Sequence, residues 1–241
     1  MDADTYCRTI EAHLCRRNAG HLVRLVGPAF EKVVGWSQAG IPIRVACAGI
    51  DRYFDRDAAK PRTRRRPVRL EFCEADVLDA FDQWRRAVGV GTAGQPAGGA
   101  AAAPAVEADE SRPTHSLRAH LDRVATRLTD GLAAGAWPAP LEAQAERLLE
   151  DLAHDREAAR TIRGEARQHL IARLQHLDAL LAAAAREAAD PQTLAALERD
   201  ADADLEGFRA RMSEADYLRA RDAAVAALLR DRWRLPVVAY L

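Results

Sequence analysis

The chain has 241 residues, of which 49% are hydrophobic and 29% are charged, and its formal net charge is −1. This length and composition are typical of a globular protein with one large or two small cores. No stretch approaches the roughly 18 apolar residues of a membrane span, and the acidic first residues lack the pattern of a secretory signal, so the sequence predicts a cytoplasmic protein that does not enter a membrane.

The first expected element is a helix over residues 2–18. Cys7, Ile10 and Leu14 fall on one face of this helix, and charged residues such as Arg8 occupy the others. This spacing predicts an amphipathic helix that buries one side.

Two helices joined by a sharp turn are expected next. Pro28 fits the first position of a helix, Gly40 fits the left-handed conformation that ends one, and Pro42 can open the next. Apolar residues then recur from Ile43 to Phe54 at spacings of three and four, which predicts a stripe that faces the turn. The pattern is the outline of a helix-turn-helix.

An arginine-rich segment, residues 60–69, follows the second of these helices. Its two prolines, Pro61 and Pro67, disfavour helix, and residues 41–70 hold nine basic and three acidic side chains, a local charge of +6. Residues 68–72 alternate between apolar and charged, which is the period of a half-buried strand. Because residues 22–26 can pair with them, a short two-stranded ribbon is expected.

The order helix, strand, helix, helix, basic loop, strand, helix resembles a winged-helix domain, with the arginine-rich segment in the place of the wing. The helix that carries Trp36, the Gly-Ile-Pro turn at residues 40–42 and a later helix with Phe81 and Trp84 are also similar to the small helical domains of DnaD-type primosome proteins. The two resemblances imply a DNA-contacting surface and a role in replication or chromosome maintenance.

Residues 89–116 divide the chain into two regions. They consist of glycine, alanine, proline and polar residues without any aromatic side chain, so they are expected to form a flexible linker. The division predicts a basic winged-helix-like domain over residues 1–88 and an acidic helical domain over residues 117–241. The predicted fold class is therefore mainly α, with the small ribbon confined to the first domain.

The acidic domain is expected to be a helical bundle or coiled coil. Apolar residues recur from Leu141 to Ala184 at spacings of three and four, which predicts one long helix. Such one-sided stripes need partners, so residues 141–241 are the candidate surface for a homodimer or another protein. The apolar last residues, 235–241, are expected to dock on the bundle or on a partner.

No catalytic residue, cofactor or metal is expected. The sequence has no nucleophile with a matching base and no glycine-rich phosphate loop between a strand and a helix. Cys7, Cys15, Cys47, His13 and His21 are ligand types that zinc accepts, but no pair of them has the close spacing of a zinc site. Four cysteines without paired spacing predict reduced thiols.

Eight arginines are the candidate nucleic-acid-binding residues. They are Arg62, Arg64, Arg65, Arg66 and Arg69 in the arginine-rich segment, with Arg44, Arg52 and Arg56 on the preceding helix. Clustered arginines contact successive phosphates and release counterions, so such binding is strong at low salt.

The leading hypothesis is a non-enzymatic, DNA-associated protein whose acidic domain self-associates or recruits a partner. Two alternatives stay open for the arginine-rich segment, which could instead neutralise acids of its own chain or bind an acidic protein. For the whole chain, the alternative is a structural helical adaptor without nucleic-acid binding.

Overall fold

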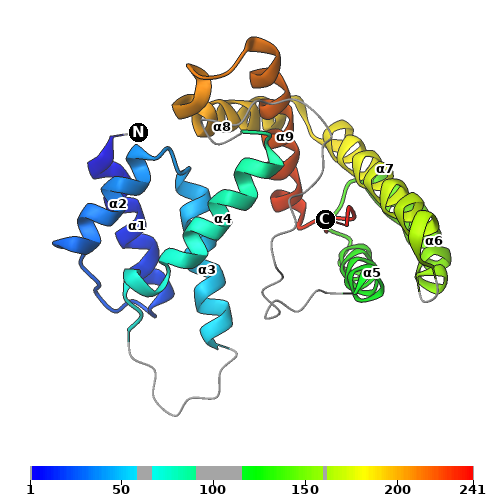
Figure 1. Cartoon of the computed structure of the whole chain (residues 1–241), viewed down its shortest axis with the longest axis horizontal. Helices are drawn as coiled ribbons and strands as arrows, with labels where there is room; N and C mark the ends of the chain where they lie inside the picture. The colour runs from blue at the N-terminus through cyan, green and yellow to red at the C-terminus, as the bar shows by residue number, and fades with distance from the viewer. Residues whose placement is uncertain (1, 59–66, 91–115, 160–161, 241) are drawn as a thin grey trace. The chain divides into compact units, whose positions relative to one another are not determined.

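The computed structural model describes four stretches of the chain, residues 2–58, 67–90, 116–159 and 162–240. Within them it contains nine α-helices, one short 3₁₀ helix and no β-strand (Figure 1). The chain forms two compact units. Unit 1 consists of Met1–Ala97 with Arg199–Ala224, and unit 2 of Gly98–Glu198 with Val225–Leu241. No described helix is long and apolar enough to cross a membrane. Most of the linker expected over residues 89–116 lies outside the described residues.

Unit 1 is built on four helices from the first part of the chain. These are α1 (Ala3–Arg17), α2 (Pro28–Gln38), α3 (Ile43–Ala58) and α4 (Glu74–Ala87). The turn expected between α2 and α3 is present, and Gly40 adopts a φ of 77°, a conformation that costs glycine little. Ile10, Leu14 and Ile50 are fully buried between these helices. The amphipathic patterns thus place the helices that form the core of unit 1.

Helices α3 and α4 pack against each other at very close range. Gly49 lies at the contact, and a Cβ atom placed there would be 2.4 Å from the Cα of Val77. Only a residue without a side chain permits this approach.

The predicted two-stranded ribbon is wrong. Residues 22–26 have no regular structure, and Leu70–Phe72 form a 3₁₀ helix, η1, instead of a strand. The reason is Asn18, which is buried at the end of α1 and whose side chain binds both the carbonyl and the N–H of Val68. Its amide nitrogen donates to the carbonyl of Val68 at 3.0 Å, and its side-chain oxygen accepts from the Val68 N–H at 2.7 Å. These groups are therefore unavailable to a neighbouring strand.

Side chains of α1 also satisfy the backbone of the other expected strand. The N–H of Leu25 donates to Glu11 Oε2 at 2.8 Å, and the N–H of Val23 donates to Cys15 Sγ at 3.3 Å. The Cys15 thiol in turn donates to the Val23 carbonyl. Three polar residues along one helix thus replace the ladder that a ribbon would have provided.

A segment from late in the chain completes unit 1. Residues 199–209 of α8 (Pro191–Arg209) place Phe208 against Phe81 and Trp84, with ring centroids 6.3 and 5.8 Å apart. Residues 214–224 of α9 (Glu214–Trp233) follow in the same unit. The aromatic core of the first domain is therefore closed by a residue more than 100 positions away in the sequence.

Unit 2 contains α5 (Leu117–Ala133), α6 (Ala139–Ala158) and α7 (Gly164–Ala188) with the last turns of α9. The single long helix expected from Leu141 is wrong, because α6 ends at Ala158 and a separate helix, α7, begins at Gly164, which adopts a φ of 57°. Arg173 of α7 pairs with Asp151 and Asp155 of α6, with nitrogen–oxygen distances of 2.7 and 3.2 Å. The two helices thus lie side by side as a hairpin, each with its leucine stripe buried.

The carboxyl-terminal segment lies against unit 2. Val238 is fully buried, and its N–H donates to Asp178 Oδ1 at 2.8 Å. The same carboxylate pairs with Arg230 at 2.7 Å. The His120 ring forms a hydrogen bond with the carbonyl of Val238, at 3.0 Å. The last residues of the chain are therefore held by polar contacts as well as by apolar burial.

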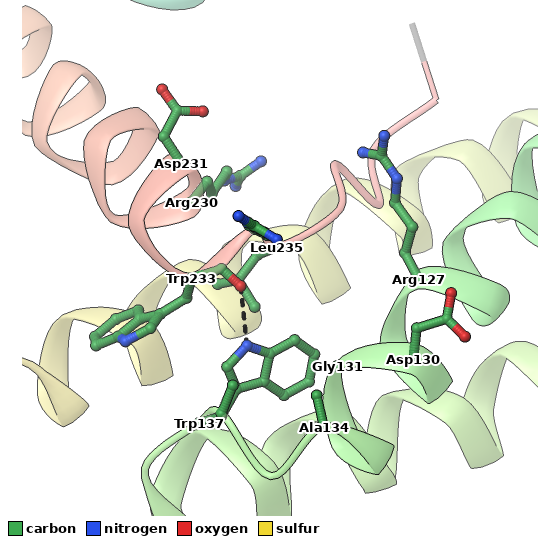
Figure 2. Close-up of a pocket in the computed structure, with 11 residues that line it drawn as sticks. Arg127, Asp130, Gly131, Ala134, Trp137, Arg230, Asp231, Trp233 and Leu235 are labelled. Carbon is green, nitrogen blue, oxygen red and sulfur yellow. Dashed lines mark hydrogen bonds between the residues drawn. The ribbon is translucent and has the colours of Figure 1, made fainter.

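A tryptophan joins the α5–α6 turn to the end of α9, as Figure 2 shows. The Trp137 indole Nε1 donates to the carbonyl of Trp233 at 2.9 Å, and its ring lies against Gly131, where a Cβ would be 2.1 Å from the ring. The indole forms one wall of a pocket that Arg127 and Arg230 also line. Arg230 is already bound to Asp178. We therefore interpret this pocket as a space left where α5 and α9 meet.

Trp137→Phe is expected to lower the free energy of unfolding by roughly 1–3 kcal/mol, because it removes this hydrogen bond and the part of the buried ring that packs on Gly131. Urea unfolding measures the change. Trp233→Phe is the matched control, since the Trp233 indole forms no hydrogen bond within the described part of the chain, and a smaller change is expected there. Equal losses in both variants would show that neither the hydrogen bond nor the packing of Trp137 on Gly131 contributes to stability.

Candidate nucleic-acid interface

Four of the eight candidate arginines, Arg62, Arg64, Arg65 and Arg66, lie outside the described residues. Arg69 is described. It precedes η1 in an extended conformation, its side chain is exposed, and it forms no ion pair with any residue that the structure describes.

Arg56 is bound within the chain. Its Nη2 donates to Asp76 Oδ2 at 2.7 Å, and its Nη1 contacts the other carboxylate oxygen. The hydrogen bond to Asp76 raises the pKa of Arg56 above its usual range. A paired geometry of this kind is specific and strong. Arg56 thus joins α3 to α4.

Arg44 and Arg52 differ in how firmly they are held. Arg44 binds Asp204 of α8 and lies 3.5 Å from a carboxylate oxygen of Asp200. Burial raises the pKa of Asp204, and the charge of Arg44 opposes that rise. Arg52 has a looser contact, 3.6 Å from Asp79. Of the three arginines on α3, Arg52 thus has the loosest contact with a carboxylate.

An aromatic cluster accompanies the arginines, and sequence reasoning missed it. We name it the aromatic shelf and define it as Tyr53, Phe54 and Phe72. Phe72 is 60% exposed and stacks on Tyr53, with ring centroids 6.4 Å apart and an angle of 14° between the planes. Phe54 meets Tyr53 edge-on at 6.3 Å.

The conformation of residues 70–72 explains why the sequence does not predict the aromatic shelf. In a strand, Leu70 and Phe72 would point to the same face. A 3₁₀ helix has three residues per turn, so residues two apart point in different directions. Leu70 is accordingly buried while Phe72 is exposed. The exposure of Phe72 follows from the 3₁₀ helix η1, which the alternating pattern of residues 68–72 does not predict.

Two arginines, one from α1 and one from α3, contact the rings of the shelf. The guanidinium carbon of Arg56 lies 5.6 Å from the centre of the Tyr53 ring, and that of Arg17 lies 5.3 Å from the centre of Phe54. Arg17 is itself paired with Asp51 and Asp55. These cation–π contacts hold the rings in place, and the charges behind them are balanced by nearby carboxylates.

The cysteines of unit 1 form no metal centre among the described residues, which contain no group of three or more candidate ligands. Burial raises the pKa of Cys73 to about 12 and that of Cys47 to about 11. Both thiols are therefore protonated near neutral pH and are poor nucleophiles. His13 is engaged by Asp51, with Nε2 2.8 Å from the carboxylate.

Comparison with protein-family models, with characterised proteins and with solved structures gave no match for this chain. The function is therefore inferred from the arginines, the aromatic shelf and the packing within each unit.

Proposed function

We propose that this chain is a non-enzymatic nucleic-acid-associated protein whose unit 1 binds the phosphate backbone through the arginine-rich segment. The observation that carries the proposal is the state of Arg69, which is exposed and unpaired among the described residues. By contrast, the other described candidates are all in contact with acids. A cation without an acidic partner is the kind that exchanges counterions for phosphates.

The carboxylates near the end of α3 support the same proposal. Asp51 and Asp55 are paired with Arg17, and Asp76 is paired with Arg56. Because these acids already have cations, fewer remain to neutralise the arginine-rich segment. A role in replication, chromosome maintenance or regulation, in the cytoplasm, fits this proposal. Residues 141–241 would then provide self-association or a protein partner.

The test is the salt dependence of DNA binding by the full chain. In the variant with Arg62, Arg64, Arg65, Arg66 and Arg69 changed to alanine, the negative slope of log K against log salt is expected to decrease in magnitude by about 3.5 to 4.5. That is about 0.7–0.9 for each phosphate that the variant no longer neutralises. Fluorescence anisotropy with a labelled oligonucleotide, between low and moderate salt, measures the slope.

A control variant with the same change in net charge tests whether the effect depends on the position of the arginines or on net charge alone. Five exposed arginines of unit 2 are changed to alanine, namely Arg123, Arg127, Arg147, Arg163 and Arg232. This control is expected to keep the wild-type slope. An equal loss in both variants would show that only net charge matters, and equal binding by the wild type and the first variant would overturn the proposal.

The second candidate function is a helical adaptor that binds proteins and no nucleic acid. It is favoured by Arg44 and Arg56, two candidate nucleic-acid-binding residues that form ion pairs with Asp204 and Asp76 of the same chain. A wild-type chain that binds neither single-stranded nor duplex DNA at low salt would select this candidate.

A further inference from the structure

We infer that the aromatic shelf stacks an unpaired base, so that unit 1 prefers single-stranded to duplex nucleic acid. This inference rests on the proposed function and names the class of nucleic acid. It starts from Phe72, whose ring is largely open to solvent although it stacks on Tyr53. A large aromatic side chain is expensive to leave in water. A further ring stacked beside it would recover that cost.

The rings of the shelf are supported by contacts within unit 1. Tyr53 is contacted by Phe54 at its edge and by the Arg56 guanidinium, which is itself fixed by Asp76. The backbone of Phe72 is held in η1, where its N–H donates to the carbonyl of Arg69 at 3.2 Å. A preformed surface loses little conformational entropy when it binds, so more of the stacking energy is available for affinity.

An exposed arginine, Arg69, lies three residues before Phe72 in the sequence. The N–H of Phe72 donates to the carbonyl of Arg69, the residue directly before η1, so the two residues lie at either end of one backbone turn. Arg69 and Phe72 are both exposed. An exposed arginine and an exposed aromatic residue three positions apart offer one group for the phosphate and one for the base of a nucleotide. Single-strand-binding surfaces combine the same two elements.

Charge selects this occupant over an apolar protein segment. Residues 41–70 carry a net charge of +6, and the aromatic shelf lies within and beside them. A polyanion with unpaired bases complements both the charge and the rings. In a duplex the bases are stacked on one another inside the helix, so Phe72 cannot reach their faces without unstacking them.

The experiment compares a labelled 20-nucleotide thymidine oligomer with a 20-base-pair duplex, each bound to the full chain at low salt. Phe72→Ala is expected to weaken binding of the oligomer by about 5- to 150-fold, the range for one stacked base. Duplex binding is expected to stay within about twofold of the wild type. Phe72→Trp is expected to retain or exceed wild-type affinity for the oligomer, because indole stacks at least as well.

Leu22→Ala is the matched control, because Leu22 is a large apolar residue of unit 1 that is 80% exposed and belongs to no ring stack. It is expected to change neither affinity. Thermal unfolding of each variant checks that the fold is retained, and Phe72→Leu gives a second variant that keeps the bulk without the ring.

Each other outcome has a defined meaning. If the wild type binds both DNAs and Phe72→Ala weakens neither, the shelf inference is wrong and the proposed function stands. If Phe72→Ala weakens both equally, Phe72 acts on the backbone site alone and the inference is overturned. If the wild type binds neither DNA, the proposed function fails and the inference fails with it. Self-association that Phe72→Ala abolishes, without an effect on the oligomer, would assign the shelf to a protein partner.

Discussion

Gly49→Ala is expected to destabilise unit 1 by about 3 kcal/mol, although alanine is the better helix former. A Cβ at this position would lie 2.4 Å from the Cα of Val77, 2.8 Å from its nitrogen and 2.9 Å from the carbonyl oxygen of Asp76. These are backbone atoms, so no side-chain rotation relieves the overlap and α3 must move away from α4. Overpacking costs roughly 1–3 kcal/mol and occasionally more, which exceeds the gain of about 1 kcal/mol in helix propensity.

Gly35→Ala is the matched control for this prediction. Gly35 lies within α2, and a Cβ there would meet nothing within 4 Å. Its replacement is expected to stabilise the protein by roughly 0.5–1 kcal/mol, through propensity alone. Urea unfolding of the two variants followed by circular dichroism compares them. If both substitutions stabilise the chain, the close approach of α3 and α4 is wrong.

The helices of unit 1 could be predicted from the sequence because their signals are local. Pro28 starts α2, and Gly40 adopts the left-handed conformation just after the end of α2. Helix α3 begins at Ile43, directly after Pro42. Each of these residues acts on its own backbone or on that of its neighbours. The helical positions therefore follow from patterns a few residues long.

The ribbon and the long helix could not be predicted correctly, because their outcome depends on competition with other contacts. The alternation over residues 68–72 is typical of a strand, but Asn18 occupies the backbone of Val68 from 50 positions away. In unit 2 the apolar spacing continues across the break before Gly164, since α6 and α7 each bury leucines. A pattern of burial alone does not say where a helix turns back.

The candidate site shows the same limit. The clustering of arginines was visible in the sequence, but the acids that bind Arg44 were not, since Asp204 lies 160 positions away. A strand over residues 68–72 would place Phe72 on the same face as Leu70, but η1 leaves Leu70 buried and Phe72 exposed. What a side chain meets after folding decides whether it can meet a ligand, and that information is carried by distant parts of the chain.

Phe208→Ala is expected to lower the free energy of unfolding of unit 1 by about 3–5 kcal/mol, the usual range for a buried phenylalanine. The ring is buried and contacts Phe81 and Trp84, and a Cβ at Gly40 would lie 3.3 Å from it. Removing it opens a cavity between α4, the α2–α3 turn and residues 199–209. Urea unfolding with tryptophan fluorescence is the measurement, because Trp84 reports on this cluster directly.

Two variants decide whether this loss comes from the shared core. Phe208→Leu keeps much of the volume and is expected to recover more than half of the stability. Phe30→Ala removes a phenylalanine of unit 1 that is 38% exposed, so a smaller loss is expected. If Phe208→Ala stayed within about 0.5 kcal/mol of the wild type, as surface substitutions do, residues 199–224 would fold apart from α1–α4. Arg44 would then lose its acidic partners and become available to a polyanion.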